Sequence, residues 1–278
     1  MTRERCARFE DCHVLVTGGA GGVGRVLAAA FVDEGAVVSL LDCSPGRASA
    51  AAAELNRTRG SEVVSGICAD VSDARAVAAA FDEAHATFGD VRVLVVGAAH
   101  ATDSDIIELS EAGWEKDVDT TLKGAFLCMQ AALPGMLRRG SGAIVSIASV
   151  NAFQYCGNAA YSAAKAGLVS LTKSVAVRYG KHGVRANVVA PGSLRTPAWD
   201  EREALRPGSL DRLSSWYPQG RVGEPGDVVG PVLFLASDEA AWVSGAVLPV
   251  DGGFLAGTPG FAEEVTGVGL PRPPSSVE

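Results

Sequence analysis

The sequence predicts an α/β protein with one doubly wound parallel sheet that is covered by helices on both faces. Apolar segments alternate with segments of helical spacing along nearly the whole chain, which is the pattern of strand–helix–strand units. The apolar segments, such as "AVVSLLD" at 36–42, are continuous hydrophobic runs, as expected of strands buried on both sides. The first of them runs directly into glycines in "HVLVTGGAGGVG" at 13–24, which indicates a tight turn between a strand and a helix.

The predicted elements follow one another in a regular order. Ala-rich helical segments end at Gly35 and Gly89, and Ser72 is the expected N-cap of the third helix. A polar segment with tryptophans follows Pro191 and is long enough to act as a lid. We expect strands at 13–19, 36–42, 62–70, 91–99, 142–149, 185–192 and 246–253, and helices at 24–35, 47–58, 73–89, 117–140, 159–181 and from about Asp227.

The bulk properties narrow the class of protein. No repeat or linker interrupts the 278 residues, so we expect one domain over 1–257 and a Pro/Gly-rich tail over 258–278, either loose or packed on a neighbouring subunit. A net charge of −8 argues against nucleic acid or an anionic membrane as a partner. The charged first residues lack an apolar signal core and no apolar run is long enough for a membrane span, so we expect a soluble cytoplasmic protein.

The six cysteines give no sign of a metal site. None lies in a CxxC pair, and no His/Cys cluster has zinc spacing. We therefore expect reduced, mostly buried thiols and no bound metal. Cys156 is the one that falls near the candidate site discussed below.

The glycine-rich turn "TGGAGGVG" at 17–24 is the first candidate binding motif. Gly18, Gly22 and Gly24, with Val23 between the last two, let the backbone approach a ligand closely. The helix that follows presents free N–H groups and a partial positive charge to a diphosphate. A purely structural turn would look similar. The strand before it, the helix after it and an acid 18 residues beyond Gly24 nevertheless favour a Rossmann-like dinucleotide site.

Two acids at strand ends bear on the choice of dinucleotide. Asp42 ends the second strand, where its carboxylate would accept both ribose hydroxyls of adenosine and repel a 2′-phosphate. No arginine immediately follows it, so the sequence favours NAD(H) over NADP(H). Asp70 ends the third strand and would accept a hydrogen bond from the adenine amino group. Either acid is equally compatible with a solvated turn residue.

The stretch "AAYSAAKAGL" at 159–168 carries a candidate acid/base pair. Tyr161 and Lys165 are four residues apart in a helical sequence, so they share one helix face. A free tyrosine titrates near 10, and bringing it to neutrality requires roughly 4 kcal/mol from nearby positive charge. Taken alone, the spacing is also that of an ordinary packing pair.

These motifs together resemble the short-chain dehydrogenase/reductase family over about residues 10–257. The matching segments are TGxxxGxG at 17–24, "CADV" at 68–71, YxxxK at 161–165, "NVVAPG" at 187–192 and a long match at 221–253. The resemblance implies that Tyr161 is the general acid/base and that Lys165 lowers its pKa and binds the nicotinamide ribose. It also implies that Ser149 hydrogen-bonds the reacting oxygen, that Thr196 holds the carboxamide, and that Val71 lies beside the cofactor.

Two family positions are not met. The fourth strand of the family ends in Asn-Asn-Ala-Gly, whereas this chain has "VGAA", so that Val96 and Gly97 keep only main-chain contacts to a cofactor. The long helix of the family carries an asparagine that holds a water next to the lysine, and Thr121 stands at that place. This departure puts the proton relay in doubt more than the acid/base pair, and we count Thr121 among the catalytic candidates. His100, just after the fourth strand, is a candidate substrate contact or a plain loop residue.

Substrate choice is expected to come from 151–158, from the loop at about 193–218 and from the turn after Gly97. Gln154, Tyr155 and Trp199 are the candidate contacts beside Ser149, and they suit an apolar or ring-containing molecule with few polar groups. Trp199 is equally suited to cover the core or a subunit contact. Arg195 is the one candidate clamp for a charged substrate.

The leading interpretation is an NAD(H)-dependent oxidoreductase that interconverts a secondary alcohol and a ketone. Two alternatives stay open: different chemistry on the same fold and cofactor, such as dehydration, epimerisation or C=C reduction, and a non-catalytic NAD(H)-binding sensor or scaffold. The resemblance further implies a homo-oligomer, a tetramer or a dimer, formed through the two long helices and the last strand.

Overall fold

The centre of the protein is a seven-stranded parallel sheet in the order β3-β2-β1-β4-β5-β6-β7, which confirms the predicted doubly wound fold. The computed structural model describes residues 7–269 of the chain. Each predicted strand is present, most with shorter bounds because the flanking residues already belong to loops. The strands are β1 (His13–Thr17), β2 (Val37–Asp42), β3 (Val64–Cys68), β4 (Val93–Val96), β5 (Gly142–Ile147), β6 (Val184–Pro191) and β7 (Val247–Val250).

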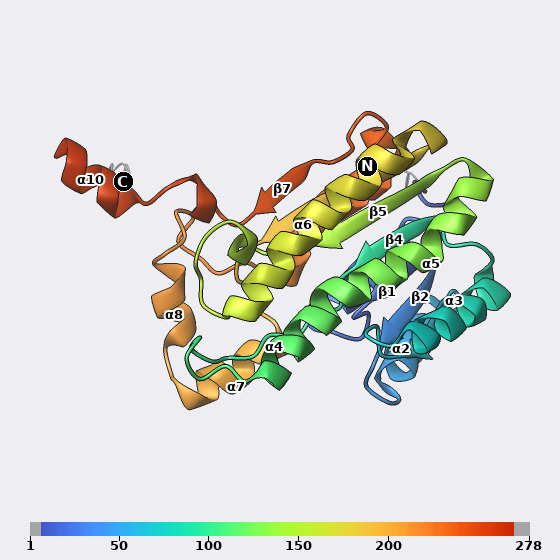
Figure 1. Ribbon diagram of the computed structural model, residues 1–278, viewed down its shortest axis with the longest axis horizontal. Helices are drawn as coiled ribbons and strands as arrows, with labels where there is room; N and C mark the ends of the chain where they lie inside the picture. Colours follow the sequence, from blue (N-terminus) through green and yellow to red (C-terminus); the bar gives the residue numbers. More distant parts are fainter. Residues whose placement is uncertain (1–6, 270–278) are drawn as a thin grey trace, which may run out of the picture.

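Helices cover both faces of this sheet (Figure 1). One apolar core joins the sheet to α1 (Gly22–Asp33), α2 (Arg47–Arg59) and α9 (Val229–Ala236). The other core joins it to α3 (Ala74–Phe88), α5 (Gly124–Arg139) and α6 (Ala159–Tyr179). Over residues 7–269, none of the helices combines the length and the apolar character needed to cross a membrane.

The long helix before β5 begins earlier than the sequence indicated. It starts as α4 (Glu111–Val118), whose first turn is capped by the Ser110 hydroxyl accepting from the N–H of Gly113 at 3.1 Å. The expected start at 117 was wrong because a serine cap among polar residues outweighed the lack of apolar spacing. A π-helical turn (Asp119–Lys123) then joins α4 to α5, and such turns often occur at functional sites.

The predicted N-cap of α3 was also wrong by one residue. Asp73, not Ser72, has extended backbone angles, and its carboxylate accepts from the N–H groups of Arg75 and Ala76 at 2.7 and 3.1 Å. Ser72 instead donates both its N–H and its hydroxyl to Asp70. Because a carboxylate carries a full charge next to the helix N-terminus, it is the stronger cap of the two.

The segment that we expected to be a polar loop at 193–218 contains two short helices. These are α7 (Pro197–Leu205), which begins at a proline, and α8 (Ser209–Ser214). The expected loose tail is helical at α10 (Pro259–Thr266), while its last nine residues, 270–278, lie outside the described part. Figure 1 shows α10 projecting away from the sheet.

Gly66 allows α2 to pack directly on β3. A Cβ atom added at Gly66 would lie 2.3 Å from the carbonyl carbon of Ala48 and 2.4 Å from its oxygen, both in the α2 backbone. We expect Gly66→Ala to lower the free energy of unfolding by about 2 kcal/mol or more, because the helix backbone must move off the strand. Gly180→Ala is the control, since that residue has helical angles and nothing within 4 Å. Urea unfolding of the two variants measures the difference, and equal losses would contradict this packing argument.

Candidate active site

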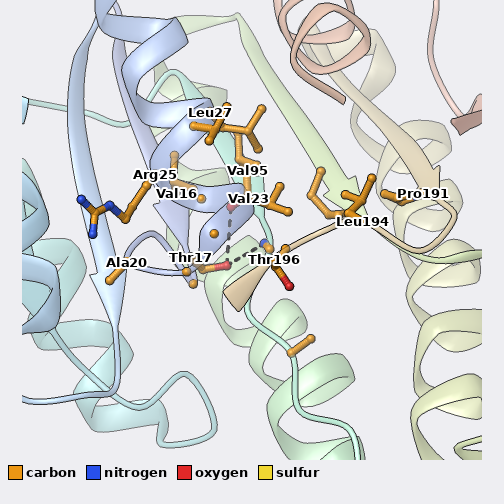
Figure 2. A pocket seen from close by; sticks show the side chains of 18 of the residues that line it. Val16, Thr17, Ala20, Val23, Arg25, Leu27, Val95, Pro191, Leu194 and Thr196 are labelled. Carbon is orange, nitrogen blue, oxygen red and sulfur yellow. Dashed lines mark hydrogen bonds between the residues drawn. The ribbon is translucent and has the colours of Figure 1, made fainter. Parts of the chain in front are cut away.

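A cavity of about 890 Å³ opens at the carboxyl ends of the central strands, where open α/β sheets bind ligands. Figure 2 shows its walls, with Val16 and Val95 on one side and Leu194 and Thr196 on the other. Its size suits a dinucleotide and part of a substrate. The residues predicted from the sequence that line it are Gly18, Gly22, Val23, Gly24, Gly97, Ser149, Tyr161, Lys165 and Thr196.

The glycine turn has the geometry of a phosphate-binding turn. Gly18 has a φ of +67°, and a Cβ on Gly24 would lie 2.4 Å from the Gly18 oxygen, so larger residues do not fit without a shift. The N-cap of α1 is Gly21, which offers no side-chain cap to the first turn. The N–H groups at this helix end are therefore available to an anionic ligand such as a diphosphate.

A second cavity of about 400 Å³ continues from the first, and Gly18, Gly21 and Gly97 line both. Asp42, Asp70 and Val71 line this second part, as expected for the adenosine end of a dinucleotide. One oxygen of Asp42 accepts from the N–H of Ser44 at 3.0 Å. One oxygen of Asp70 accepts from Ser72, so part of its bonding capacity is used by a turn.

The end of β4 is held in place without asparagine side chains. The Thr17 hydroxyl accepts from the N–H groups of Gly97 and Ala98 at 3.0 and 3.1 Å, and Figure 2 shows it beside the strand end. The side chain of Val96 is 2% exposed and packs in the core, so the cofactor contact expected at this residue stays a prediction for its main chain alone. Val95 lines the cavity instead, because side chains alternate along a strand.

Sequence reasoning missed Arg47, which lines both cavities. It is the first residue of α2, and its guanidinium donates to the Ala20 carbonyl at 3.2 Å and to the Ser44 hydroxyl at 3.4 Å. The search for an arginine directly after Asp42 overlooked it, since it follows five residues later. The adenosine end thus contains a guanidinium as well as a carboxylate.

Ser149, Tyr161 and Lys165 meet at the inner end of the first cavity. Ser149 follows β5 and is only 9% exposed. Its hydroxyl accepts from the N–H of Asn151 at 3.2 Å and donates to the side-chain oxygen of Asn151 at 3.0 Å. Asn151 was not recognised from the sequence, and it fixes the position of the Ser149 hydroxyl.

Lys165 is a buried lysine with one strong partner. It is 2% exposed, and its Nζ donates to the Ile147 carbonyl at 2.6 Å. The same Nζ lies 5.4 Å from the centre of the Tyr161 ring. Burial lowers the pKa of Lys165 to about 7, because a charged amine is poorly solvated there.

The protein groups by themselves raise the pKa of Tyr161 rather than lower it. Burial of the phenol is the main cause; the hydrogen bond with Ser149 works in the opposite direction, and the charge of Asp117 adds a further rise. The lowering that we expected from Lys165 is not among these causes. The physical reason is that Lys165 is itself buried, so its positive charge is costly to maintain.

Thr121 lies inside the π-helical turn and is fully buried. Its hydroxyl accepts from the N–H of His100 at 3.2 Å and donates to the His100 carbonyl at 3.3 Å. A hydroxyl has one proton to donate, and here it goes to the main chain. Thr121 therefore fixes the segment after β4 and does not line either cavity.

The predicted substrate contacts lie around the cavity without lining it. Gln154 and Tyr155 are exposed, with Tyr155 at 86%, and Trp199 is partly buried with its ring 5.0 Å from the Arg202 guanidinium carbon. Arg195 pairs with Glu224 at 3.2 Å. Cys156 is exposed and likewise lines neither cavity.

Comparison with known proteins shows the class to which this fold and cleft belong. The family model described as "Enoyl-(Acyl carrier protein) reductase" matches residues 18–255. An uncharacterized oxidoreductase of Schizosaccharomyces pombe is 42% identical over 91% of this chain and 94% of its own length. Cis-4-hydroxycyclohexanecarboxylate dehydrogenase of Sinomonas cyclohexanicum is 38% identical over 89% of this chain and 98% of its own.

A solved structure agrees with these sequence matches. An oxidoreductase of the short-chain dehydrogenase/reductase family from Burkholderia thailandensis is 40% identical, covers 92% of this chain and 98% of its own, and has a TM-score of 0.84. The chain belongs to the short-chain dehydrogenase/reductase family. The sequence-based assignment to this family is confirmed.

The buried amine of Lys165 gives a testable pH dependence of stability. The folded chain releases its proton near pH 7, whereas an unfolded lysine keeps it to about 10.5, so the unfolded chain binds more protons between these values. Wild-type stability should therefore rise with pH relative to Lys165→Met, by about 3 kcal/mol between pH 7 and 9.5. Urea unfolding at several pH values measures this, with Lys173→Met, exposed on the same helix, as control. A difference in unfolding free energy between wild type and Lys165→Met that stays constant with pH would contradict the burial argument.

Proposed function

We propose that this protein is an NAD(H)-dependent oxidoreductase that interconverts a secondary alcohol and a ketone, with Tyr161 as general acid/base. The observation that supports this most directly is that Ser149, Tyr161 and Lys165 line the same cavity as the glycine turn. A dinucleotide seated on the turn would share one closed space with the acid/base group. That arrangement is what a hydride and a proton transfer to neighbouring atoms of one substrate require.

Tyr161, Ser149 and Lys165 each have a separate role in this proposal. Tyr161 takes the hydroxyl proton when the alcohol is oxidised and returns it when the ketone is reduced. The N–H of Asn151 orients the Ser149 oxygen, and when substrate binds, the single hydroxyl proton turns from the side-chain oxygen of Asn151 to the reacting oxygen, where it stabilises charge that develops. Lys165 binds the nicotinamide ribose and, when protonated, favours the phenolate of Tyr161. A bound nicotinamide dinucleotide supplies the acceptor or donor of the hydride.

The substrate we propose is a fairly apolar or cyclic small molecule. Large apolar side chains are exposed in segments that flank the cleft, with Phe153 at 46% and Trp216 at 64%. The relative from Sinomonas cyclohexanicum is named for a hydroxylated cyclohexane ring, which agrees with this class. Contacts from Gln154, Tyr155 and Trp199 require these segments to close over the substrate.

We further propose that the chain forms a homo-oligomer through α5, α6 and β7. Phe126 on α5 is 44% exposed, Val177 on α6 is 85% exposed and Leu248 on β7 is 38% exposed. Apolar side chains on the outer surface of these elements would be buried in such an assembly.

Loss of the phenol hydroxyl should abolish turnover. We expect Tyr161→Phe to reduce kcat by at least about 100-fold, the size of a general acid/base contribution, while binding of NADH is retained. Tyr179→Phe, near the far end of the same helix, should retain activity. Absorbance at 340 nm with cyclic secondary alcohols and the matching ketones measures both. Unchanged turnover in Tyr161→Phe would refute the acid/base role, and NADH binding without any turnover would favour the sensor interpretation.

The choice between dinucleotides should depend on two residues of opposite charge. We expect wild type to bind NADH more tightly than NADPH, and Asp42→Asn to shrink this preference by about tenfold, because the carboxylate repels the 2′-phosphate. Arg47→Ala should enlarge the preference, because its guanidinium lines the same end of the cavity as Asp42 and would attract a 2′-phosphate. Fluorescence titration gives the dissociation constants of NADH and NADPH for wild type and each variant, and Arg57→Ala on the same helix is the control. Tighter binding of NADPH by wild type would contradict the proposal.

A further inference from the structure

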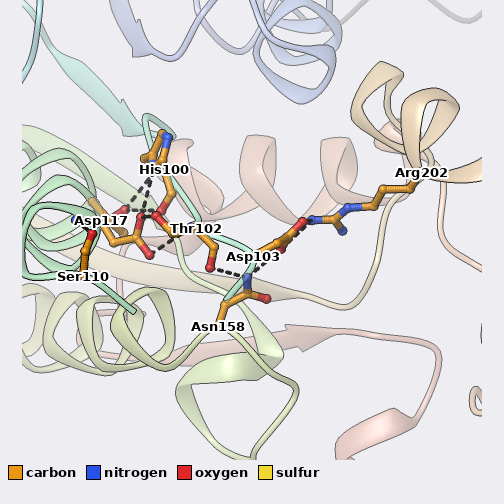
Figure 3. A network of polar contacts seen from close by, with 9 residues as sticks. His100, Thr102, Asp103, Ser110, Asp117, Asn158 and Arg202 are labelled. Carbon is orange, nitrogen blue, oxygen red and sulfur yellow. Dashed lines mark hydrogen bonds and ion pairs between the residues drawn. The ribbon is translucent and has the colours of Figure 1, made fainter. Parts of the chain in front are cut away.

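Asp117 is a fully buried carboxylate close to the active site. Its side chain has no exposed surface, and it lies one helical turn before Thr121 on α4. It accepts from Nδ1 of His100 at 2.8 Å and from the N–H and hydroxyl of Thr102 at 3.0 and 2.9 Å. Figure 3 shows these three groups converging on it. His100 is the one ionisable side chain among these partners.

The contact with Asp117 determines which nitrogen of His100 is free. A carboxylate accepts hydrogen bonds, so Nδ1 carries a proton in this pair. In the neutral ring, Nε2 then holds a lone pair, and none of the hydrogen bonds among residues 7–269 uses it. The side chain is 36% exposed and lines the second cavity, so Nε2 has access to solvent. This is the arrangement by which a buried carboxylate prepares an imidazole to accept a proton.

The main chain of His100 is fixed as firmly as its ring. The Thr121 hydroxyl bonds both the N–H and the carbonyl of this residue, which uses its single proton. His100 is therefore held by its N–H, its carbonyl and its ring Nδ1. The Thr121 hydroxyl, in contrast, has already donated its one proton and cannot pass on another. The preceding residue, Ala99, lines the first cavity together with Tyr161 and Lys165.

The reaction proposed above needs an exit for its proton. Oxidation breaks the O–H bond, whose proton goes to Tyr161, and the C–H bond, whose hydride leaves with both electrons for the nicotinamide, so that the C=O bond forms. Lys165 is 2% exposed and Thr121 is fully buried, so neither exchanges protons with bulk water directly. Asp117 is near enough that its charge contributes, after burial, to raising the pKa of Tyr161.

We propose that His100 exchanges the reaction proton between the Tyr161–Lys165 pair and solvent, and that Asp117 is the positioning residue that fixes its tautomer. The proposal rests on the proposed oxidoreductase function and deepens it. During oxidation the proton on Tyr161 passes by way of Lys165 and water to Nε2, and from there to solvent; reduction runs the same path in reverse. Imidazole suits this task because it takes up and releases protons near neutral pH.

The charges around His100 belong in any account of its pH dependence. Asp117 contacts the ring itself, and Asp103 lies on the same loop. Other ionisable groups line the two cavities: Lys116 on α4, Asp42 at the end of β2, Arg25 on α1, Arg47 and Glu54 on α2, Asp70 after β3, and Tyr161 and Lys165 on α6. Among residues 7–269 none of these other groups is hydrogen-bonded or ion-paired to the ring, so Asp117 is its charged partner.

The test compares His100→Ala, His100→Gln and Asp117→Asn with wild type, on the full chain with NAD⁺ and an alcohol substrate. We expect His100→Ala to reduce kcat by about tenfold or more with little change in KM, and free imidazole in the buffer to restore much of it. His100→Gln should also flatten the rise of kcat with pH near neutrality. His85→Ala is the control. His85 lies on α3, pairs with Asp90 at 3.0 Å and lines neither active-site cavity.

A second measurement does not depend on turnover. Nitrogen-15 NMR of histidine-labelled protein reports the tautomer of each ring, and His100→Gln assigns the signal. We expect the Nδ1–H form in wild type and its loss in Asp117→Asn. A neutral Nε2–H form in wild type would overturn the proposal, because that nitrogen then has no lone pair to accept a proton.

The kinetic outcomes separate this proposal from the function on which it rests. Full kcat and an unchanged pH profile in His100→Ala, with Tyr161→Phe inactive, would overturn the role of His100 and leave the oxidoreductase function intact. A loss of kcat in His100→Ala that imidazole does not restore, accompanied by a lower melting temperature, would also overturn the proposal. His100 would then only stabilise the fold. No Tyr161-dependent turnover in wild type would overturn both, since proton exchange then has no reaction to serve.

Discussion

The amine of Lys165 is buried at the carboxyl end of the sheet. Its low pKa, which results from this burial, is the constraint on which the chemistry of the site depends. Within residues 7–269, Nζ donates one hydrogen bond, to the carbonyl of Ile147 at 2.6 Å. A main-chain dipole stabilises an ammonium less than a carboxylate would, so the pKa of Lys165 falls to about 7. The amine therefore gains and loses its proton at working pH, a property that serves proton transfer and costs folding stability.

Tyr161 shares this buried environment, and its chemistry depends on what joins it there. Burial alone raises the pKa of the phenol, and the bond to Ser149 offsets part of that rise. Further lowering requires positive charge beside the phenol, which Lys165 can supply only while it is protonated. The phenol is thus held in its neutral form by its protein surroundings, and in the proposed acid/base role its reactivity would depend on what binds beside it.

Polar contacts connect the segment after β4 to the start of α6 and to α7. Asn158, just before α6, has a left-handed φ of 53° and donates to the Thr102 carbonyl at 2.9 Å and to Asp103 at 2.7 Å. Asp103 also pairs with Arg202 on α7 at 2.8 Å, as Figure 3 shows. The segment after β4 therefore connects the buried Asp117, the start of the helix that carries Tyr161, and the helices over the cleft. Exposed ion pairs are weak, so the contact to α7 is the one that opens most easily.

The sequence by itself determined the sheet, the glycine turn and the shared helix face of Tyr161 and Lys165, because continuous apolar runs, tight turns and i,i+4 spacing are local patterns that one stretch of chain specifies. Ser149 was indicated only by the resemblance to the family. Only the tertiary structure decided the matters that depend on partners distant in sequence. It turned Val96 into the core, brought Arg47 to the adenosine end, and paired His100 with Asp117 across 17 residues. Those contacts follow from burial and hydrogen-bond satisfaction, since a polar group removed from water must find a partner wherever the fold places one.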